Sequence, residues 1–486
     1  MTSSSIVPFI DAMWDDQIVP TLTEYIRIPN KSPAFDPQWA ANGYMDRAVS
    51  LFAGWARAHL GSFPGAQLEV VRLPARTPLL LIEIPGTVSG TVLLYGHLDK
   101  QPEMVGWTDG AGPWQPILKD DRLYGRGGAD DGYAMFGALA ALLALRQAGQ
   151  PHARCVILIE ACEESGSPDL PAYIEHLGPR LGVPDLVVCL DSGAGNYEQL
   201  WLTTSLRGLV IGTLSVRVLE QGQHSGAASG IVPSSFRILR ALLSRIEEEG
   251  TGRVLLPEFH AAIPSERRDQ AARAAAILGD SVWAELPWHA RTQPMAADAA
   301  SLILARTWQP QLAITALEGY PTVKDGGNVL LPYTAAKLSM RVPPGVDSSR
   351  AAAALKRTLE RDPPYGAGVS FELSGADDGW NAPPLAPWLE RSLDAASEAH
   401  YGRPAAYQGE GGSIPFMAML GRKFPQTQFV ITGVLGPHSN AHGPNEFLHV
   451  GYARKLTGCI AAILGDHARR PDSLGTPADR PFRAGS

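Results

Sequence analysis

Seven side chains that can bind a metal ion or transfer a proton stand just after apolar stretches of this 486-residue sequence. Residues 91–95 have the composition of a buried strand, and Gly96, His97, Leu98 and Asp99 follow them. His97 and Asp99 are two residues apart, so their side chains project the same way from extended backbone. Alone, such a pair is more often a solvated hydrogen-bonded pair than a metal site. The other candidates are Asp130, Glu163, Glu164, Asp191 and His442.

The elements expected around these residues alternate between strands and helices. Strands are predicted over residues 155–160 and 185–190, and a helix rich in Ala and Leu over 133–147. Asp130 and Asp131 would then lie at the start of that helix, where one Asp would suffice as a cap. Open α/β sheets bind ligands beyond the carboxyl ends of their strands. We therefore expect these acidic residues to gather at one edge of a sheet.

Two histidines and several carboxylates suit a pair of divalent metals such as zinc or manganese. No cysteine shares a turn with His97 or His442, which argues against a structural zinc finger. The adjacent pair Glu163 and Glu164 favours hydrolysis, because one carboxylate can bind metal while its neighbour moves protons.

A change of pattern after Gly208 indicates a second domain inserted into the first. Its expected order is β-α-β-β-α-β, which is the ferredoxin-like arrangement, with a helical insertion near 252–310. The predicted fold class is α/β: a domain with a mixed sheet flanked by helices, plus an inserted ferredoxin-like α+β domain. The expected boundaries are 1–206 and 383–468 for the first domain, 207–382 for the insertion, and 469–486 for a disordered tail.

The composition excludes several classes of partner. A formal net charge of −8 argues against nucleic acid and anionic membranes. No signal peptide is visible at the N-terminus, and no apolar run is long enough to span a bilayer. The four cysteines are few and lack a CxxC spacing, so a reduced, cytoplasmic location is expected.

Five motifs together resemble a known family. They are His97-Leu98-Asp99, the Gly-rich run from Gly125 to Asp131, Glu163-Glu164-Ser165-Gly166-Ser167, Asp191-Ser192, and Ala441-His442 followed by Asn445-Glu446. In this order they resemble the co-catalytic metallopeptidases of the carnosinase, aminoacylase and succinyl-diaminopimelate desuccinylase family. The run Gly409-Glu410-Gly411-Gly412-Ser413 and the sequence Gln223-His224-Ser225-Gly226 are most similar to the cytosolic nonspecific dipeptidase and carnosinase branch.

The resemblance implies that the domain with the mixed sheet is the catalytic domain and that the inserted domain is a lid and dimerisation domain. It also implies two divalent ions in each subunit, with zinc preferred and manganese as the alternative. Asp130 would bridge the ions and would be joined to Asp131 by a cis peptide bond. Asp191 would join His97 on one ion, and Glu164 would join His442 on the other. The neighbouring His438 is a weaker candidate for the last ligand. Glu163 would be the general base for a water between the ions, and Asp99 would orient His97 or tune the base.

The same resemblance assigns four residues to substrate binding: His224, Asn328, Arg341 and Ser413. His224 would help to stabilise the oxyanion, and in dipeptidase relatives this histidine reaches the partner subunit's site, so a homodimer through the inserted domain is expected. Arg341 and Ser413 would hold the substrate carboxylate. An alternative stays open for each of two residues: His224 could cap a turn, and Arg341 could be a surface cation. The stretch after Asn328 is one residue longer than in relatives, which leaves its role open.

The predicted function is metal-dependent hydrolysis of the amide bond of dipeptides or related N-acyl amino acids. The nearest alternative is an N-acyl amino acid deacylase or desuccinylase with the same metal site. An alternative of another class is a noncatalytic binding or assembly protein that retains the fold, but such a protein would be expected to have lost ligands, and all of them are present.

Overall fold

The computed structural model describes residues 3–108 and 110–470, and the chain divides into two compact units. The first unit draws on Met1–Thr203, Ala382–Tyr407 and Met419–Ser486, and the second on Thr204–Asn381 and Gln408–Ala418. The sequence places residues 408–418 in the catalytic domain, but in the structure they group with the second unit. Thr204 Oγ1 donates to Gln408 O at 3.1 Å, and Arg207 Nε donates to Gly411 O at 3.1 Å. The expected tail from 469 lies outside the described residues from residue 471 on, and a helix continues to Arg469.

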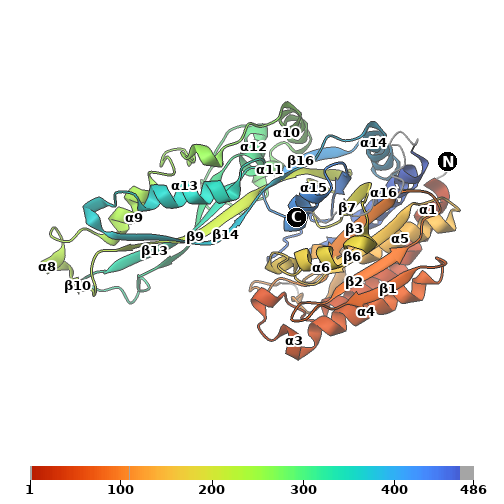
Figure 1. The fold of residues 1–486 in the computed structure, drawn as a ribbon, viewed down its shortest axis with the longest axis horizontal. Coiled ribbons are helices and arrows are strands. Elements are labelled where there is room, and N and C mark those ends of the chain that lie inside the picture. The colour runs from red at the N-terminus through yellow and green to blue at the C-terminus, as the bar shows by residue number, and fades with distance from the viewer. Residues whose placement is uncertain (1–2, 109, 471–486) are drawn as a thin grey trace. The chain divides into compact units, whose positions relative to one another are not determined.

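A six-stranded mixed sheet forms the centre of the first unit (Figure 1). Its parallel strands are adjacent, because β3 pairs in parallel with β6 and β7, and β7 with β17, whereas β2 is antiparallel to both β6 and β1. The carboxyl ends of β3, β6 and β7 therefore meet at one edge. In spatial order the strands are β1 (Gln67–Val71), β2 (Leu79–Ile84), β6 (Arg154–Glu160), β3 (Thr91–His97), β7 (Leu186–Cys189) and β17 (Gln428–Ile431).

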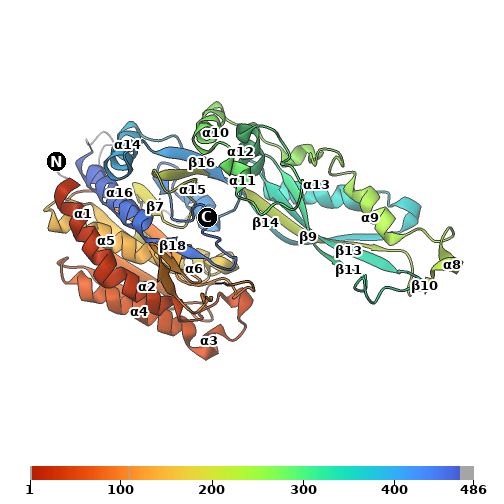
Figure 2. The ribbon, with the colours of Figure 1, turned by 180° about the vertical axis from the view of Figure 1, so that it is seen from behind.

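Helices pack around this sheet, and the most buried of them is α5 (Ala134–Gln147). Its residues from Ala134 to Leu145 are all buried, as expected for a helix that is apolar on every side. It contacts β3, α1 and α16, and α14 packs on α16 in turn (Figure 2). The other helices of this unit are α1 (Ser3–Met13), α2 (Val19–Ile26), α3 (Trp39–Asn42), α4 (Tyr44–Leu60), α6 (Leu170–His176), α7 (Gly178–Leu181), α14 (Pro387–Tyr401) and α16 (Val450–Arg469). The boundary between the two units, after Ala418, falls within α15 (Pro415–Lys423).

Two small three-stranded sheets complete the connections. One has the order β18 (Phe447–His449), β5 (Arg122–Tyr124), β4 (Ile117–Lys119), so it joins a C-terminal segment to the stretch that precedes Asp130. The other has the order β15 (Trp380–Asn381), β8 (Trp201–Leu206), β16 (Ala406–Glu410).

The second unit contains a four-stranded antiparallel sheet of order β11-β13-β9-β14. Helices α9 and α13 pack against it in the chain order β9-α9-β11-β13-α13-β14, which is the ferredoxin-like arrangement. Between α9 and β11 the chain forms α10, α11 and α12. The elements are β9 (Gly208–Arg217), β10 (Gln223–His224), α8 (Ser225–Ala228), α9 (Ser235–Leu243), α10 (Ser265–Leu278), α11 (Ser281–Ala284), α12 (Ala299–Trp308), β11 (Gln311–Glu318), β12 (Val329–Leu330), β13 (Tyr333–Val342), α13 (Ser348–Glu360) and β14 (Gly368–Asp377).

The predicted α/β class with a mixed sheet is confirmed, and local boundaries differ in two places. Helix α5 begins at Ala134, because residues 128–132 form a distorted turn in which Asp130 and Asp131 have non-helical backbone angles. The sequence pattern predicts a helix over 234–249, but helix α9 ends at Leu243, six residues earlier. Use of the second unit as a lid stays a prediction. Within residues 3–108 and 110–470, no helix combines the length and apolar character needed to cross a membrane.

His467, near the end of α16, generates a prediction about stability. Its side chain is fully buried, and Nε2 lies 3.8 Å from Asp185 Oδ2. Burial and the nearby Arg470 cation lower the pKa of His467 to about 4, and Asp185 offsets this only in part. The pKa in the unfolded chain is about 6.5. Between these values only the unfolded chain takes up the proton, so the free energy of unfolding decreases as the pH falls.

We therefore expect the free energy of unfolding of the metal-depleted protein to decrease as the pH falls from 6.5 to 4. The decrease in His467→Leu should be smaller than in the wild type by on the order of 2 kcal/mol. Urea unfolding of both proteins at pH 7 and pH 4.5 measures the difference. Equal losses in the two proteins would show that His467 does not take up the proton.

Candidate metal centre

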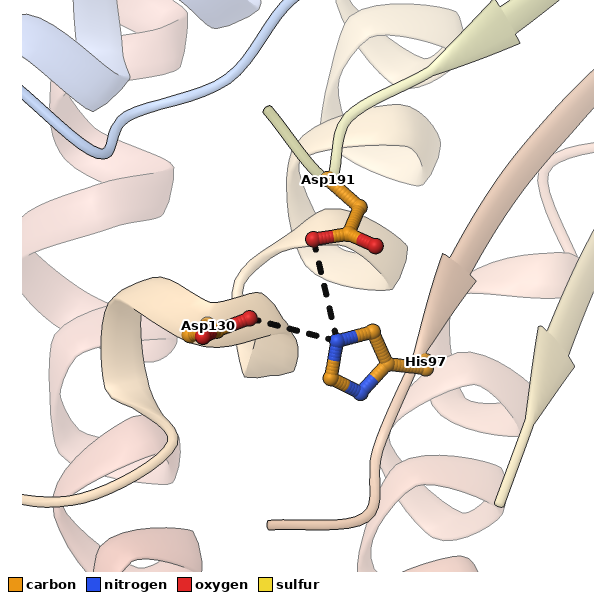
Figure 3. A group of neighbouring side chains, drawn as sticks. All are labelled: His97, Asp130 and Asp191. Atoms are coloured by element: carbon orange, nitrogen blue, oxygen red, sulfur yellow. Dashed lines mark hydrogen bonds and ion pairs between the residues drawn. The ribbon is translucent and has the colours of Figure 1, made fainter. Parts of the chain in front are cut away.

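His97, Asp130 and Asp191 form one group that can hold a metal ion (Figure 3). His97 ends β3, Asp191 follows β7, and Asp130 comes from the turn before α5. His97 Nε2 lies 3.3 Å from Asp130 Oδ1 and 3.8 Å from Asp191 Oδ1. One imidazole nitrogen and two carboxylate oxygens thus point toward a common position, as Figure 3 shows.

A second group consists of Asp130, Glu164 and His442. His442 Nε2 lies 3.0 Å from Asp130 Oδ2 and 3.3 Å from Glu164 Oε2. Asp130 belongs to both groups and offers a different oxygen to each, which is the geometry of a carboxylate that bridges two ions. His438 belongs to neither group in the part of the chain that the structure describes. The grouping agrees with the pairing implied by the resemblance, and the ligand roles themselves stay predictions.

The donor set fits two divalent cations. Each group offers one imidazole nitrogen and two carboxylate oxygens, a combination found around catalytic zinc. Glu164 Oε1 is buried and has no hydrogen-bond partner among the described residues. A buried charged oxygen without a partner is unfavourable, and a cation beside it would satisfy it.

The charges in this cluster shift several pKa values. Burial would raise the pKa of Asp130, but hydrogen bonds from His442 and His97 hold it below its usual range. Burial would lower the pKa of His97, but the Asp191 charge and the hydrogen bond with Asp130 raise it well above the usual value. The pKa of Glu163 is raised well above its usual range by burial and by the Asp191 charge. The negative charge of Asp191, which raises the pKa values of His97 and Glu163, also favours cations.

Asp99 holds the turn that carries the two glutamates. Its Oδ1 accepts from Glu163 N at 3.1 Å, and its Oδ2 accepts from Glu164 N at 3.0 Å. The same Oδ1 lies 3.5 Å from His97 Nδ1, and the side chain is fully buried. Asp99 therefore contacts both the imidazole and the backbone of the expected base.

The strand end at His97 packs tightly against the turn before α5. A Cβ atom on Gly96 would lie 2.6 Å from Asp131 Oδ2, so only glycine fits there. Asp131 Oδ2 accepts from His97 N at 3.2 Å. The peptide bond between Asp130 and Asp131 is cis, as the resemblance implies.

The four residues predicted to bind substrate all lie in the second unit. His224 and Asn328 are neighbours, because β10 pairs with β12 and Ser225 N donates to Asn328 O at 2.9 Å. His224 is exposed, and its Nδ1 accepts from Gly226 N at 3.2 Å, so it does cap a turn.

Arg341 on β13 is half-buried and lies near Arg207. Burial and the positive charges of Arg341 and Arg306 lower the pKa of Arg207 to about 10. Arg207 also bonds to Gly411 O, which places the loop of Ser413 in the same region. The substrate-binding roles stay predictions.

Comparison with known proteins identifies the family. Residues 93–466, well over half of the chain, match the model of "Peptidase family M20/M25/M40". The chain belongs to this peptidase family. Among curated relatives, this M20/M25/M40 member is 27% identical over 414 residues to the cysteinylglycine-S-conjugate dipeptidase of Corynebacterium striatum, covering 82% of this chain and 88% of the relative. It is 28% identical over 371 residues to the Beta-Ala-His dipeptidase of Homo sapiens, covering 73% and 71%.

Solved structures share the fold of this family member. A di-peptidase of Saccharomyces cerevisiae superimposes with a TM-score of 0.78 at 20% identity, covering 97% of this chain and 99% of that chain. Human carnosine dipeptidase 1 gives a TM-score of 0.74 at 22% identity, covering 96% and 100%.

Sequence reasoning assigned no role to several residues that contact the two groups or the segments that carry them. Gln101 Nε2 donates to Glu164 Oε2 at 2.6 Å, and Arg126 forms a buried ion pair with Glu446. Arg126 and Glu446 stand within the motifs that carry the resemblance, so their positions could have been noticed. No pattern in the sequence points to Gln101.

The double acceptor role of Asp99 generates a prediction. Asp99→Asn replaces one acceptor oxygen by an NH₂ group that faces a backbone N–H, so the turn of Glu163 and Glu164 should move. We expect zinc affinity to fall about 10- to 100-fold, the usual effect of losing a partner that supports a ligand. Competition with a chromophoric chelator measures the affinity.

The matched control for this variant is Asp169→Asn. Asp169 also accepts from a backbone N–H, that of Thr77 at 2.8 Å, but it belongs to neither group. It should lower the melting temperature without changing zinc affinity. Unchanged zinc affinity in Asp99→Asn would contradict the prediction.

Proposed function

We propose that this chain is a metal-dependent dipeptidase that binds two divalent ions, with zinc preferred and manganese as the alternative. The observation that carries the proposal is the shared Asp130, whose two oxygens face two separate ligand groups. The named relatives are dipeptidases, which supports a dipeptide as the substrate class.

The ions, when bound, supply Lewis acidity at water and at the peptide carbonyl. His97 and Asp191 would hold one ion, Glu164 and His442 the other, and Asp130 both. Glu163 lies beside Glu164 in a turn fixed by Asp99. Its carboxylate would take a proton from the attacking water and return it to the leaving amine, as a general base and then a general acid.

The carboxylate of the substrate would bind in the second unit. Arg341 lies in the same region as Arg207, Arg306 and the loop of Ser413. This concentration of guanidinium groups supports an anion site, since arginine matches the geometry of a carboxylate. Asn328 would contact the substrate from beside His224.

We further propose a homodimer through the second unit. Strand β11 is an edge strand of its sheet, and Ile314 and Leu317 on it are exposed. An exposed edge with apolar side chains is suited to association with another chain. A cytoplasmic location is also proposed, because Cys155, Cys162, Cys189 and Cys459 are all buried and free.

The test of the function is turnover by metal-loaded protein. We expect hydrolysis of free dipeptides after loading with zinc or manganese, and its loss after chelation. Glu163→Gln should lower kcat about 10²- to 10⁴-fold, the range for a general base, while both metals stay bound. Glu164→Gln is the matched control, because it should lose metal as well as activity.

The outcomes separate the alternatives. Faster turnover of N-acetyl or N-succinyl amino acids than of dipeptides would favour the deacylase, which uses the same site. Absence of metal by elemental analysis, together with no turnover after loading, would favour a noncatalytic protein. Full activity of Glu163→Gln would remove Glu163 from the mechanism.

The proposed role of His224 in a partner subunit gives a separate prediction. His224→Ala and Glu163→Gln subunits should each be inactive alone. Mixed after dissociation and reassociation, they should recover activity well above either parent, because one site of the mixed dimer then has both residues intact. Steady-state assays of the mixture measure this, with tagged subunits to confirm mixed dimers. No recovery in confirmed mixed dimers would place His224 outside the partner's site.

A further inference from the structure

A buried ion pair outside the two ligand groups joins the segments that carry them. Arg126 is 1% exposed and Glu446 is not exposed at all, and Arg126 Nη1 donates to Glu446 Oε2. The two residues are 320 positions apart in the sequence. Burying two charges carries a large desolvation penalty, so a fully buried pair needs good geometry and further hydrogen bonds.

Arg126 donates two further hydrogen bonds, each to the backbone of a different loop. Its Nε donates to Pro102 O at 3.1 Å, and its Nη2 donates to Gly443 O at 2.8 Å. Pro102 belongs to the loop that follows His97, and Gly443 directly follows His442. The guanidinium group therefore fixes the backbone next to His442 and the loop that follows the strand of His97.

Glu446 fixes the third segment. Its Oε1 accepts from Gly127 N at 2.8 Å, and its backbone O accepts from Gly125 N at 2.9 Å. Gly127 opens the turn that contains Asp130. The pairing of β18 with β5 continues into these bonds, so the C-terminal loop is joined to this turn by backbone and side chain together.

The loop of His442 needs such support. Four residues of this loop have positive φ angles, between 53° and 64°, which residues other than glycine adopt rarely. They are His438, Asn440, His442 and Asn445. Such conformations persist only when surrounding contacts hold them. The His442 side chain is itself 56% exposed, so packing around the imidazole contributes little.

We propose that Arg126 and Glu446 are positioning residues that set the affinity of the group Asp130, Glu164 and His442 for its cation. The inference rests on the proposed two-metal function. Arg126 and Glu446 touch no ligand atom in the described structure; they act by holding Gly443 next to His442 and Gly127 near Asp130. The other group shares Asp130, but its His97 ends β3 and its Asp191 follows β7, so it depends less on this pair.

The experiment measures two zinc dissociation constants by chelator competition on metal-depleted protein, with elemental analysis for stoichiometry. Arg126→Lys keeps the charge but loses the planar fork that reaches Pro102 and Gly443. Glu446→Gln keeps an acceptor for Gly127 but removes the charge. We expect each variant to weaken one zinc about 10- to 100-fold and to leave the other nearly unchanged.

Two background variants identify which zinc is weakened. In His442→Ala, where the second group is already broken, Arg126→Lys should cause no further loss. In Asp191→Asn, where the first group is broken, Arg126→Lys should still weaken the zinc that remains. This is a double-mutant cycle, in which coupled residues are not additive.

A third variant separates positioning from stability. Arg126→Met combined with Glu446→Leu replaces the buried ion pair by apolar side chains, an exchange that is often neutral for stability. This double variant should melt near the wild-type temperature, but one of its two zinc ions should still be bound more weakly than in the wild type. The control is Arg154→Lys, which alters the ion pair with Glu83 at 2.8 Å in the same unit. It should change the melting temperature alone.

Each outcome decides the matter. Tight binding of two zinc ions by all the Arg126 and Glu446 variants would overturn the proposal. An equal loss of affinity for both zinc ions would also overturn it. Failure of every one of these variants to fold, while Arg154→Lys folds, would assign the pair to stability and overturn its positioning role. A wild-type protein that binds no zinc or manganese would instead overturn the proposed function itself.

Discussion

Mutual repulsion among buried carboxylates is the constraint on which the rest of the molecule depends. Six of them converge on two imidazoles at one edge of the main sheet: Asp99, Asp130, Asp131, Glu163, Glu164 and Asp191. Burial alone would drive several of them to the neutral form, as the raised pKa values of Asp131 and Glu164 show. Only a concentrated positive charge can keep such a set ionised.

The fold meets this constraint with hydrogen bonds from the backbone to two of the acidic side chains, Asp99 and Asp131. Asp99 accepts from two N–H groups of the glutamate turn, and Asp131 accepts from the N–H of His97. These bonds orient the carboxylates whose charges face inward, and they leave Asp130 with both oxygens directed at imidazoles. Rigid support of this kind is what holds a reactive geometry in place before a ligand arrives.

The sequence predicted much of this arrangement, because its signals are local. The strand of His97 and the strands before Glu163 and Asp191 are short apolar runs, so their ends and the acidic residues beyond them could be located. The ferredoxin-like order followed from the same periodicity.

Other features depend on contacts between distant segments and had no local signal. The sequence pattern assigns residues 408–418 to the C-terminal segment, but their hydrogen-bond partners Thr204 and Arg207 lie about two hundred positions earlier in the chain. The sequence pattern predicts a helix start at Asp130, but the backbone there is not helical. The pattern could not show this, because tertiary contacts set the backbone angles of a glycine-rich turn. The Arg126–Glu446 pair was visible as two motif residues, but only the structure shows that they meet.

The discontinuity of the first unit has a consequence for biosynthesis. Its central sheet needs β17, and α5 packs on α16, so the sheet and this helix lack these partners until the ribosome has made residues 428–469. His442 arrives in the same late segment. The ferredoxin-like sheet of the second unit, by contrast, is complete in sequence by Asp377. During translation this sheet can therefore form first, and the proposed ligand set would be assembled last, so that metal would bind only once the enclosing unit is finished.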